Sequence, residues 1–340
     1  MAPPFYFPIL LIYSASDVKA FGSGYNAVAT MQYLISLEII AVQLNQFKCG
    51  SLALGVCFSH KIIDGSTASS FLNAWAKASR GQGNENLIPK MEEAAMLFPP
   101  MKNFEIDLTR GMLGHKNIVT KKIIFSESNI FGLRKNIIYE CSNFNISRVE
   151  AVTALMWKSS LEAAKASSGD GKFPTSKACH AVNIRNKMTP TLPKHSTGNL
   201  WHAGMSSMVE VKGELRLHDL VERVREAIKK IDGEYISKLH GVEFPNKIIA
   251  AFEGMKILAL EKSIPFYSFT SWINFNFYEA NFGWGKPTYV HTIGIPMENW
   301  AILMATRDGN GIEALLTLTT HDMTQLEQNP DFLNFASFDS

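Results

Sequence analysis

Two titratable residues four positions apart, His60 and Asp64, are the strongest candidates for chemistry in this chain of 340 residues. An imidazole that titrates near neutrality can act as a general base, and a nearby carboxylate can orient it or brace its loop. The spacing alone is weak evidence, because chance produces roughly 0.3 such matches in a chain of this composition. On the spacing alone, a histidine that only packs in the core is the favoured interpretation.

The residues before His60 predict a β-hairpin. Apolar residues alternate over Glu38–Phe47 and again over Leu52–His60, which is typical of half-buried strands. Between them lies the segment KCGS, in which Gly50 can adopt a positive φ and close a turn. The histidine therefore stands where the second strand of the hairpin ends.

The residues after Asp64 predict a helix. Apolar residues recur there at helical spacing as far as Gly81, and Ser66 or Thr67 is the expected N-cap. His60 and Asp64 thus flank a strand-to-helix junction, a place where rigid elements often hold functional side chains.

Composition excludes several classes of function. The net charge is +2 with no basic run, which argues against nucleic acid or an acidic membrane as partner. No apolar run is long enough to span a bilayer, and the N-terminal segment has prolines and lacks the basic region of a signal peptide. The cysteines form no C-x-x-C pair, so we expect reduced thiols and a cytoplasmic protein. They are Cys49, Cys57, Cys141 and Cys179.

The organisation of the chain favours an α+β protein with mixed sheets. Residues 81–120 lack periodicity and form the best linker candidate, whereas helical patterns follow at 147–164 and from 217 to about 239. We therefore predict a first domain over residues 1–100, a linker over 101–120 and a second domain over 121–340.

Other motifs are weak or missing. The segment GSGYNA (Gly22–Ala27) has the glycine spacing of a dinucleotide loop, but no clean βαβ unit surrounds it. No G-x-S-x-G elbow, Walker loop or H-E-x-x-H occurs. The histidines show no metal-ligand spacing, so we expect no metal site.

Support for a catalytic histidine comes from the segment NFGWGKP, about 220 residues after His60. The segments HKIIDG and NFGWGKP together resemble the H-x-x-x-D-G and D-F-G-W-G-K-P motifs of the plant BAHD acyltransferases. Other segments that resemble this family, such as AVNIR, STGNLW and TSWINF, follow in order between Ile39 and the C-terminus. Two motifs in the right order and spacing are far more specific than either one alone.

This resemblance implies a fold and a reaction. The fold would be two domains of mixed β-sheet flanked by helices, similar to chloramphenicol acetyltransferase, with the active site at the domain interface. The reaction would move an acyl group from a coenzyme A thioester to an alcohol or amine. The proportions of the chain resemble the alkaloid-acylating branch, which implies acetyl transfer to a hydroxyl of an alkaloid or another plant specialised metabolite. Acyl-CoA is then a co-substrate, no cofactor is permanently bound, and we expect a monomer.

The resemblance also implies roles for single residues. His60 is the expected general base, and Thr270 and Trp272 match positions that contribute to the oxyanion pocket. Asp64, the second residue of the catalytic motif, is expected to pair with Arg185 and to brace the loop that presents the histidine. Gly65 would relieve the backbone behind that loop.

The second motif departs from the family at its first position, where Asn281 replaces an aspartate. The family motif lies away from the catalytic histidine and acts on shape and coenzyme A binding, through the residues that match Asn281, Phe282, Gly283, Trp284 and Gly285. An asparagine keeps hydrogen-bonding capacity but leaves any buried basic partner without an ion pair, which could cost several kcal/mol. Ala305 also replaces a common aspartate, and Phe282 and Trp284 are expected to pack in the core.

The largest departure is a shortened first domain. The chain is shorter than family members by roughly a fifth to a quarter, and nearly all of the deficit falls between the N-terminal strand and Ile39. We infer an internal deletion, which puts the activity of this chain in question. Two alternatives to an active acyltransferase remain. One is an inactive relative that only binds a ligand or a partner, or is non-functional. The other is an unrelated hydrolase with His60 as base, against which the missing nucleophile elbow argues.

Overall fold

The computed structural model describes most of the chain. The described residues are 6–19, 39–83, 90–98, 117–139, 145–169, 172–173, 175–193, 195–211, 214–238 and 266–339. The glycine segment Gly22–Ala27, Cys141 and residues 101–116 of the expected linker lie outside them.

The chain divides into two compact units, and neither is continuous in sequence. Unit 1 comprises Met1–Asp107, Pro190–Leu200 and Asn274–Ile293, and unit 2 comprises Leu108–Thr189, Trp201–Ile273 and Gly294–Ser340. This differs from the predicted boundaries, which assigned everything after residue 120 to the second domain. The physical reason is strand pairing, because β8 (Tyr289–His291) hydrogen-bonds to β1 (Tyr6–Tyr13) and joins the NFGWG segment to unit 1.

Unit 1 is built on a four-stranded antiparallel sheet with the order β2-β3-β1-β8. The predicted hairpin is confirmed: β2 (Ile40–Gln46) and β3 (Leu52–Ser59) pair with Ile40 opposite Phe58. Alternate residues of β1 are buried, as expected for a strand with one face on the core.

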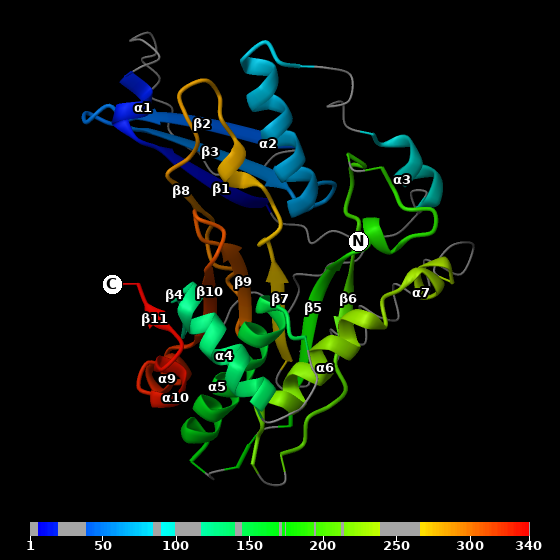
Figure 1. Cartoon of the computed structure of the whole chain (residues 1–340), viewed down its shortest axis with the longest axis vertical. Coiled ribbons are helices and arrows are strands. Elements are labelled where there is room, and N and C mark those ends of the chain that lie inside the picture. Colours follow the sequence, from blue (N-terminus) through cyan, green and yellow to red (C-terminus); the bar gives the residue numbers. More distant parts are fainter. Residues whose placement is uncertain are drawn as a thin grey trace. The chain divides into compact units, whose positions relative to one another are not determined.

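Helix α2 (Gly65–Ser79) lies along the sheet of unit 1, as Figure 1 shows. The ring of Phe71 on this helix meets Phe58 of β3 edge-on at 5.9 Å between centroids. Three short elements complete the described part of the unit. They are α1 (Ala15–Lys19), α3 (Glu92–Leu97) and the 3-10 turn η3 (Phe277–Glu279).

Unit 2 contains a seven-stranded mixed sheet with the order β11-β4-β10-β9-β7-β5-β6. The pairs β5–β7 and β7–β9 are parallel, and the other pairs are antiparallel. The strands are β4 (Ile118–Phe125), β5 (Lys177–Asn183), β6 (Trp201–Met205), β7 (Phe266–Ser271), β9 (Trp300–Ala305), β10 (Ile312–Thr319) and β11 (Ser337–Phe338).

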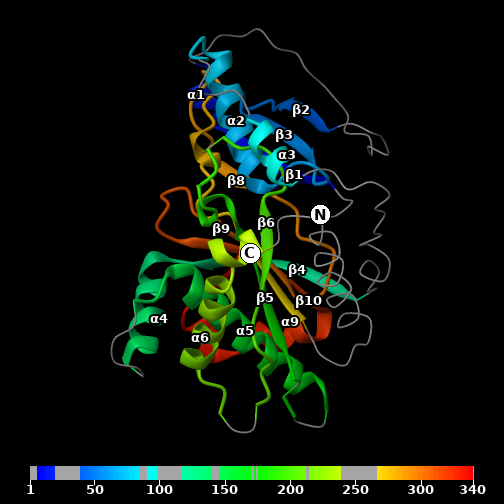
Figure 2. The ribbon, with the colours of Figure 1, turned by 90° about the vertical axis from the view of Figure 1, so that its right-hand side faces the viewer.

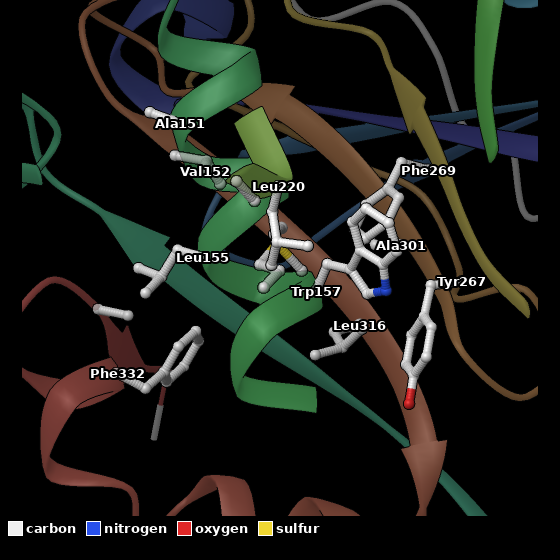
Figure 3. Close-up of a cluster of buried hydrophobic side chains, with 14 of the residues drawn as sticks. Ala151, Val152, Leu155, Trp157, Leu220, Tyr267, Phe269, Ala301, Leu316 and Phe332 are labelled. Carbon is white, nitrogen blue, oxygen red and sulfur yellow. The ribbon is translucent and has the colours of Figure 1, made fainter. Parts of the chain in front are cut away.

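Helices cover this sheet and bury its core (Figure 2). They are α4 (Glu127–Tyr139), α5 (Arg148–Ser167), α6 (Leu217–Lys229), α9 (Thr320–Leu326) and α10 (Pro330–Leu333). The short helix α7 (Gly233–Ser237) and the 3-10 turn η2 (Arg185–Lys187) also belong to unit 2. Helix α5 is buried around most of its circumference, and Trp157 on it is fully buried beside Leu220 and Tyr267 (Figure 3). The predicted α+β fold with mixed sheets is therefore confirmed.

One predicted helix is split. The pattern from 217 to about 239 forms α6 and then α7, because the Asp232 carboxylate accepts the Tyr235 N–H at 2.8 Å and starts a new helix. Gly233 follows, where a Cβ would approach the Lys187 carbonyl oxygen to 2.9 Å. Among all described helices, none is long and apolar enough to cross a membrane.

Candidate active site

His60 lies immediately after β3, at the junction that the sequence predicted. Its ring is partly buried and packs against Phe7 of β1, with 4.9 Å between ring centroids. Its Nδ1 atom is 3.0 Å from Oδ1 of Asn199, and Nδ2 of Asn199 donates to the backbone oxygen of His60 at 2.7 Å. Two hydrogen bonds with one side chain thus link the histidine to a loop 139 residues away in sequence.

The surroundings of His60 favour a neutral imidazole. Burial lowers its pKa, and this effect outweighs three that raise it: a hydrogen bond to its own backbone, the negative charge of Asp64, and the hydrogen bond with Asn199. A histidine with a lowered pKa is unprotonated near neutral pH, which is the state that can accept a proton from a substrate.

Asp64 holds the backbone at the junction. Its Oδ1 accepts the N–H of Thr67 at 2.8 Å, so Asp64 is the N-cap of α2, and the expectation of Ser66 or Thr67 as N-cap is wrong. Its Oδ2 accepts the N–H of Leu200 at 3.0 Å. Both carboxylate oxygens therefore bind backbone N–H groups, which fits a brace. Gly65 is the first residue of the helix and is buried.

Thr67 ties the same two segments together. Its hydroxyl donates to the backbone oxygen of Gly198 at 3.1 Å, and the N–H of Gly198 points back to the hydroxyl at 3.2 Å. Gly198 has a φ of 142°, which other residues adopt only with strain. We call residues 198–200 the support loop, since each of them is hydrogen-bonded to the segment from His60 to Thr67.

The sequence alone did not reveal the role of Asn199. The segment STGNLW was part of the family resemblance, but nothing in one sequence shows that an asparagine so far away faces His60. The contact arises because residues 190–200 pack with unit 1 while both neighbouring segments belong to unit 2.

Arg185, the expected partner of Asp64, is buried in η2 of unit 2. Its backbone N–H and its Nη1 donate to Oδ1 of Asn183 at 3.1 and 3.2 Å. The pairing of Arg185 with Asp64 stays a prediction.

The two residues expected at the oxyanion pocket lie in unit 2. Thr270 is in β7 opposite Ile302 of the parallel strand β9. Trp272 follows β7, is buried, and donates its backbone N–H to the oxygen of Leu303 at 2.7 Å. Their contribution to an oxyanion pocket stays a prediction.

The NFGWG segment folds into a tight loop around the side chain of Asn281. Oδ1 of Asn281 accepts the N–H groups of Gly283 at 2.9 Å and Gly285 at 3.1 Å. Both glycines have positive φ, 116° and 92°. The amide oxygen thus accepts from two N–H groups that a carboxylate could also bind. Asn281 therefore uses the hydrogen-bonding capacity that was expected of it. Ala305, the other departure, ends β9 in unit 2.

Phe282 is buried, as expected of a core aromatic, whereas Trp284 is only partly buried. The Phe282 ring meets Trp75 of α2 edge-on at 4.9 Å, and Trp284 meets Tyr13 of β1 at 5.8 Å. The hydroxyl of Tyr13 donates to the backbone oxygen of Ala280 at 2.8 Å. The loop is therefore joined to α2, which follows His60 in sequence, and to β1, whose Phe7 packs against the His60 ring. Its expected action on coenzyme A binding stays a prediction.

Within the described part of the chain, no group of three or more histidine, cysteine, aspartate or glutamate side chains could hold a metal ion. Of the cysteines that the structure describes, Cys57 and Cys179 are buried free thiols.

Comparison with known proteins gives one consistent family. A model of a transferase family matches residues 24–333. Limonoid 7-O-acetyltransferase of Citrus sinensis is 34% identical over 317 residues, which are 89% of this chain and 68% of that protein. Vinorine synthase of Rauvolfia serpentina is 33% identical over 288 residues, 84% of this chain and 64% of that protein. The chain thus spans about two thirds of the length of these relatives.

The solved structures agree with the fold. The crystal structure of vinorine synthase matches with a TM-score of 0.70 at 31% identity. The match covers 88% of this chain and 66% of that structure. The structure of TRI101 of F. sporotrichioides, complexed with coenzyme A and T-2, also has a TM-score of 0.70, at 16% identity and over 99% of this chain. At that identity only the fold is shared. On the extent of the family match and the identity of its relatives, the chain belongs to the transferase family of the plant BAHD acyltransferases.

Proposed function

We propose that this chain is an acyl-CoA-dependent O-acyltransferase in which His60 is the general base. The observation that carries the proposal is the position of His60: it lies at a strand-to-helix junction, is held by Asn199, and belongs to a chain of an acyltransferase family. Burial lowers its pKa, which fits a base. The coenzyme A in the complex of TRI101, which shares this fold, supports coenzyme A as carrier of the acyl group.

The proposed reaction needs no covalent acyl-enzyme. His60 accepts the proton of the acceptor hydroxyl while the oxygen attacks the thioester carbonyl. The new C–O bond gives a tetrahedral intermediate whose oxyanion needs fixed hydrogen-bond donors, a role that we assign to the pocket of Thr270 and Trp272. The C–S bond then breaks, and the coenzyme A thiolate takes the proton from the imidazolium. The products are the ester and coenzyme A.

We propose acetyl as the acyl group and a hydroxyl of an alkaloid or another plant specialised metabolite as the acceptor. Names of relatives support this choice, since limonoid 7-O-acetyltransferase and stemmadenine O-acetyltransferase of Catharanthus roseus, 32% identical, are both named for O-acetyl transfer. At this level of identity the pocket residues that select an acceptor diverge, so the acceptor is to be found by screening.

The test is product formation by the purified chain. Acetyl-CoA and longer acyl-CoA donors are offered with hydroxylated alkaloids and limonoids, and acylated products are identified by mass spectrometry. We expect an O-acetylated product with the wild type and with the control His321→Ala, which changes an exposed histidine on α9. We expect no product with His60→Ala.

Failure of the wild type with every donor and acceptor would contradict the proposal and favour the inactive relative. A longer chain with the missing family segment restored is the positive control for the assay. Activity in that chain alone would assign the loss to the shortened first domain.

We further propose that the protein acts as a monomer in the cytoplasm. The free thiols of Cys57 and Cys179 fit a reducing compartment. Light scattering of the eluting protein after size-exclusion chromatography tests the monomer, since a mass of twice 37.9 kDa would contradict it.

A further inference from the structure

We propose that Asn199 is a positioning residue that holds the proton of neutral His60 on Nδ1 and so leaves Nε2 as the basic nitrogen. The inference deepens the proposed function and rests on it for the role of the base. Its evidence is the pair of hydrogen bonds between Asn199 and His60.

The first step fixes the orientation of the Asn199 amide. A backbone carbonyl oxygen only accepts hydrogen bonds, and the His60 oxygen lies 2.7 Å from one terminal atom of the amide. That atom must therefore be the NH₂ nitrogen, since an oxygen there would face another oxygen. The assignment rests on the hydrogen-bond network, as amide orientations must.

The second step fixes the proton on the ring. With Nδ2 directed at the carbonyl, Oδ1 of Asn199 is the atom 3.0 Å from Nδ1 of His60. An amide oxygen has no hydrogen to donate, so the hydrogen between the two atoms belongs to Nδ1. The hydrogen bond of the ring to its own backbone favours the same tautomer, because a carbonyl too is only an acceptor.

The third step is the consequence for chemistry. A neutral imidazole carries one N–H, so a proton on Nδ1 leaves the lone pair of Nε2 as the proton acceptor. General-base catalysis requires that lone pair to face the substrate hydroxyl in a fixed direction. Contact with Phe7 restricts the ring plane, and the bond with Asn199 restricts its rotation.

The support loop keeps Asn199 itself in place. The preceding residue, Gly198, exchanges two hydrogen bonds with Thr67, and the following residue, Leu200, donates to Asp64. Both neighbours of Asn199 are thus fixed to the segment that carries His60. A side chain fixed on both sides loses little entropy when it holds the ring.

Among the described side chains, the charge that acts on His60 is the carboxylate of Asp64 in the same segment. It raises the pKa of the imidazole. Phe7 of β1 and Asn199 of the support loop are uncharged. A carboxylate at position 199 would add a second negative charge at Nδ1 and raise the pKa of His60. An apolar residue there would remove a hydrogen bond that raises the pKa, and so lower it.

The direct experiment is nuclear magnetic resonance of the whole chain labelled with ¹⁵N-histidine, in which protonated and unprotonated ring nitrogens resonate far apart. The His60 signals are assigned by their loss in His60→Gln. In the wild type above the pKa of His60, we expect a protonated Nδ1 and an unprotonated Nε2. In Asn199→Leu the His60 ring keeps only the hydrogen bond to its own backbone, so we expect a mixture of the two tautomers.

Kinetics supply the second readout. We expect Asn199→Leu to lower kcat roughly 10- to 100-fold with little change in KM, as loss of alignment does. The acid limb of the pH profile of kcat/KM should move down in Asn199→Leu and up by about one pH unit or more in Asn199→Asp. The matched control is Asn73→Leu, which removes an asparagine bonded to the Ser69 and Asn276 carbonyls in the same unit and should keep the wild-type profile.

Two results would overturn the inference. One is a neutral wild-type His60 protonated on Nε2. The other is an unchanged tautomer and pH profile in both Asn199 variants with only a lower Tm, which would make Asn199 a purely structural residue. If the wild type transfers no acyl group but shows the predicted tautomer, the proposed function fails while the positioning of His60 by Asn199 stands.

Discussion

Replacing Asp64 with alanine should destabilise unit 1 more than the loss of an ordinary helix cap. The Asp64 side chain is 5% exposed and accepts the N–H groups of Thr67 and Leu200. Loss of an N-cap costs about 1 kcal/mol, with a range of about 0.5–2. The N–H of Leu200 would in addition remain buried without its acceptor, at about 1–3 kcal/mol. The sum is about 2–4 kcal/mol.

The assay is hydrogen exchange of the backbone amides of α2, measured by mass spectrometry, because it reports opening of this region separately from unit 2. A loss of about 2–4 kcal/mol corresponds to exchange roughly 30- to 1000-fold faster where opening and reclosing are rapid relative to exchange. The matched control is Asp232→Ala in α7, whose carboxylate also caps a helix but through the single N–H of Tyr235 at an exposed site. The control should cost about 1 kcal/mol locally.

Equal effects of Asp64→Ala and Asp232→Ala would refute this reasoning. Asp64→Asn separates a brace from an electrostatic partner of His60. Its amide keeps one acceptor but directs an NH₂ group at the other backbone N–H, so a brace predicts clear destabilisation. Wild-type protection of α2 in Asp64→Asn, together with lost activity, would contradict the account.

Three further predictions concern other residues. Asn281→Leu removes the acceptor of two backbone N–H groups and should lower the free energy of unfolding by about 2 kcal/mol. Asn281→Asp keeps an acceptor, so its free energy of unfolding in urea should stay within about 1 kcal/mol of the wild type. A gain of several kcal/mol in Asn281→Asp would instead reveal an unpaired basic partner. In Gly285→Ala, the residue keeps a positive φ and its new Cβ lies only 2.9 Å from the Cβ of Asp17. The Tm of this variant should fall well below that of Gly309→Ala, where φ is also positive but no atom lies within 4 Å of the new Cβ. Equal Tm values would contradict the steric argument. Burial lowers the pKa of His180, whose Nε2 has no hydrogen-bond partner among the residues that the structure describes. The unfolded chain therefore binds this proton first, and stability should fall as the pH drops below about 6.5. Scanning calorimetry should show a weaker fall in His180→Leu, and an unchanged slope would exclude His180 as a contributor.

The local structure around His60 could be predicted from the sequence because it depends on short-range patterns. Alternation fixed the two strands of the hairpin, and helical spacing fixed α2, which the structure has as Gly65–Ser79. The N-cap was missed because Asp64, Ser66 and Thr67 are all good caps, and only the backbone at Asp64, with φ of −92° and ψ of 172°, selects among them.

The long-range parts of the site could not be predicted from periodicity. Residues 190–200 and 274–293 return to unit 1 from the second half of the chain, through hydrogen bonds of Asn199 and Leu200 and through pairing of β8 with β1. Such contacts depend on tertiary packing, and a single sequence contains no signal for them. The motif resemblance supplied NFGWG but not its place beside α2.

The central claim is that His60 removes the proton of the acceptor, and the most direct measurement is the rate of coenzyme A release by wild type and His60→Gln. Acetyl-CoA and the acceptor found by the product screen are used, with Tm measured for both proteins. We predict that kcat/KM falls at least roughly 100-fold in His60→Gln while the Tm stays close to that of the wild type. A folded His60→Gln that releases coenzyme A within about threefold of the wild-type rate would contradict the account.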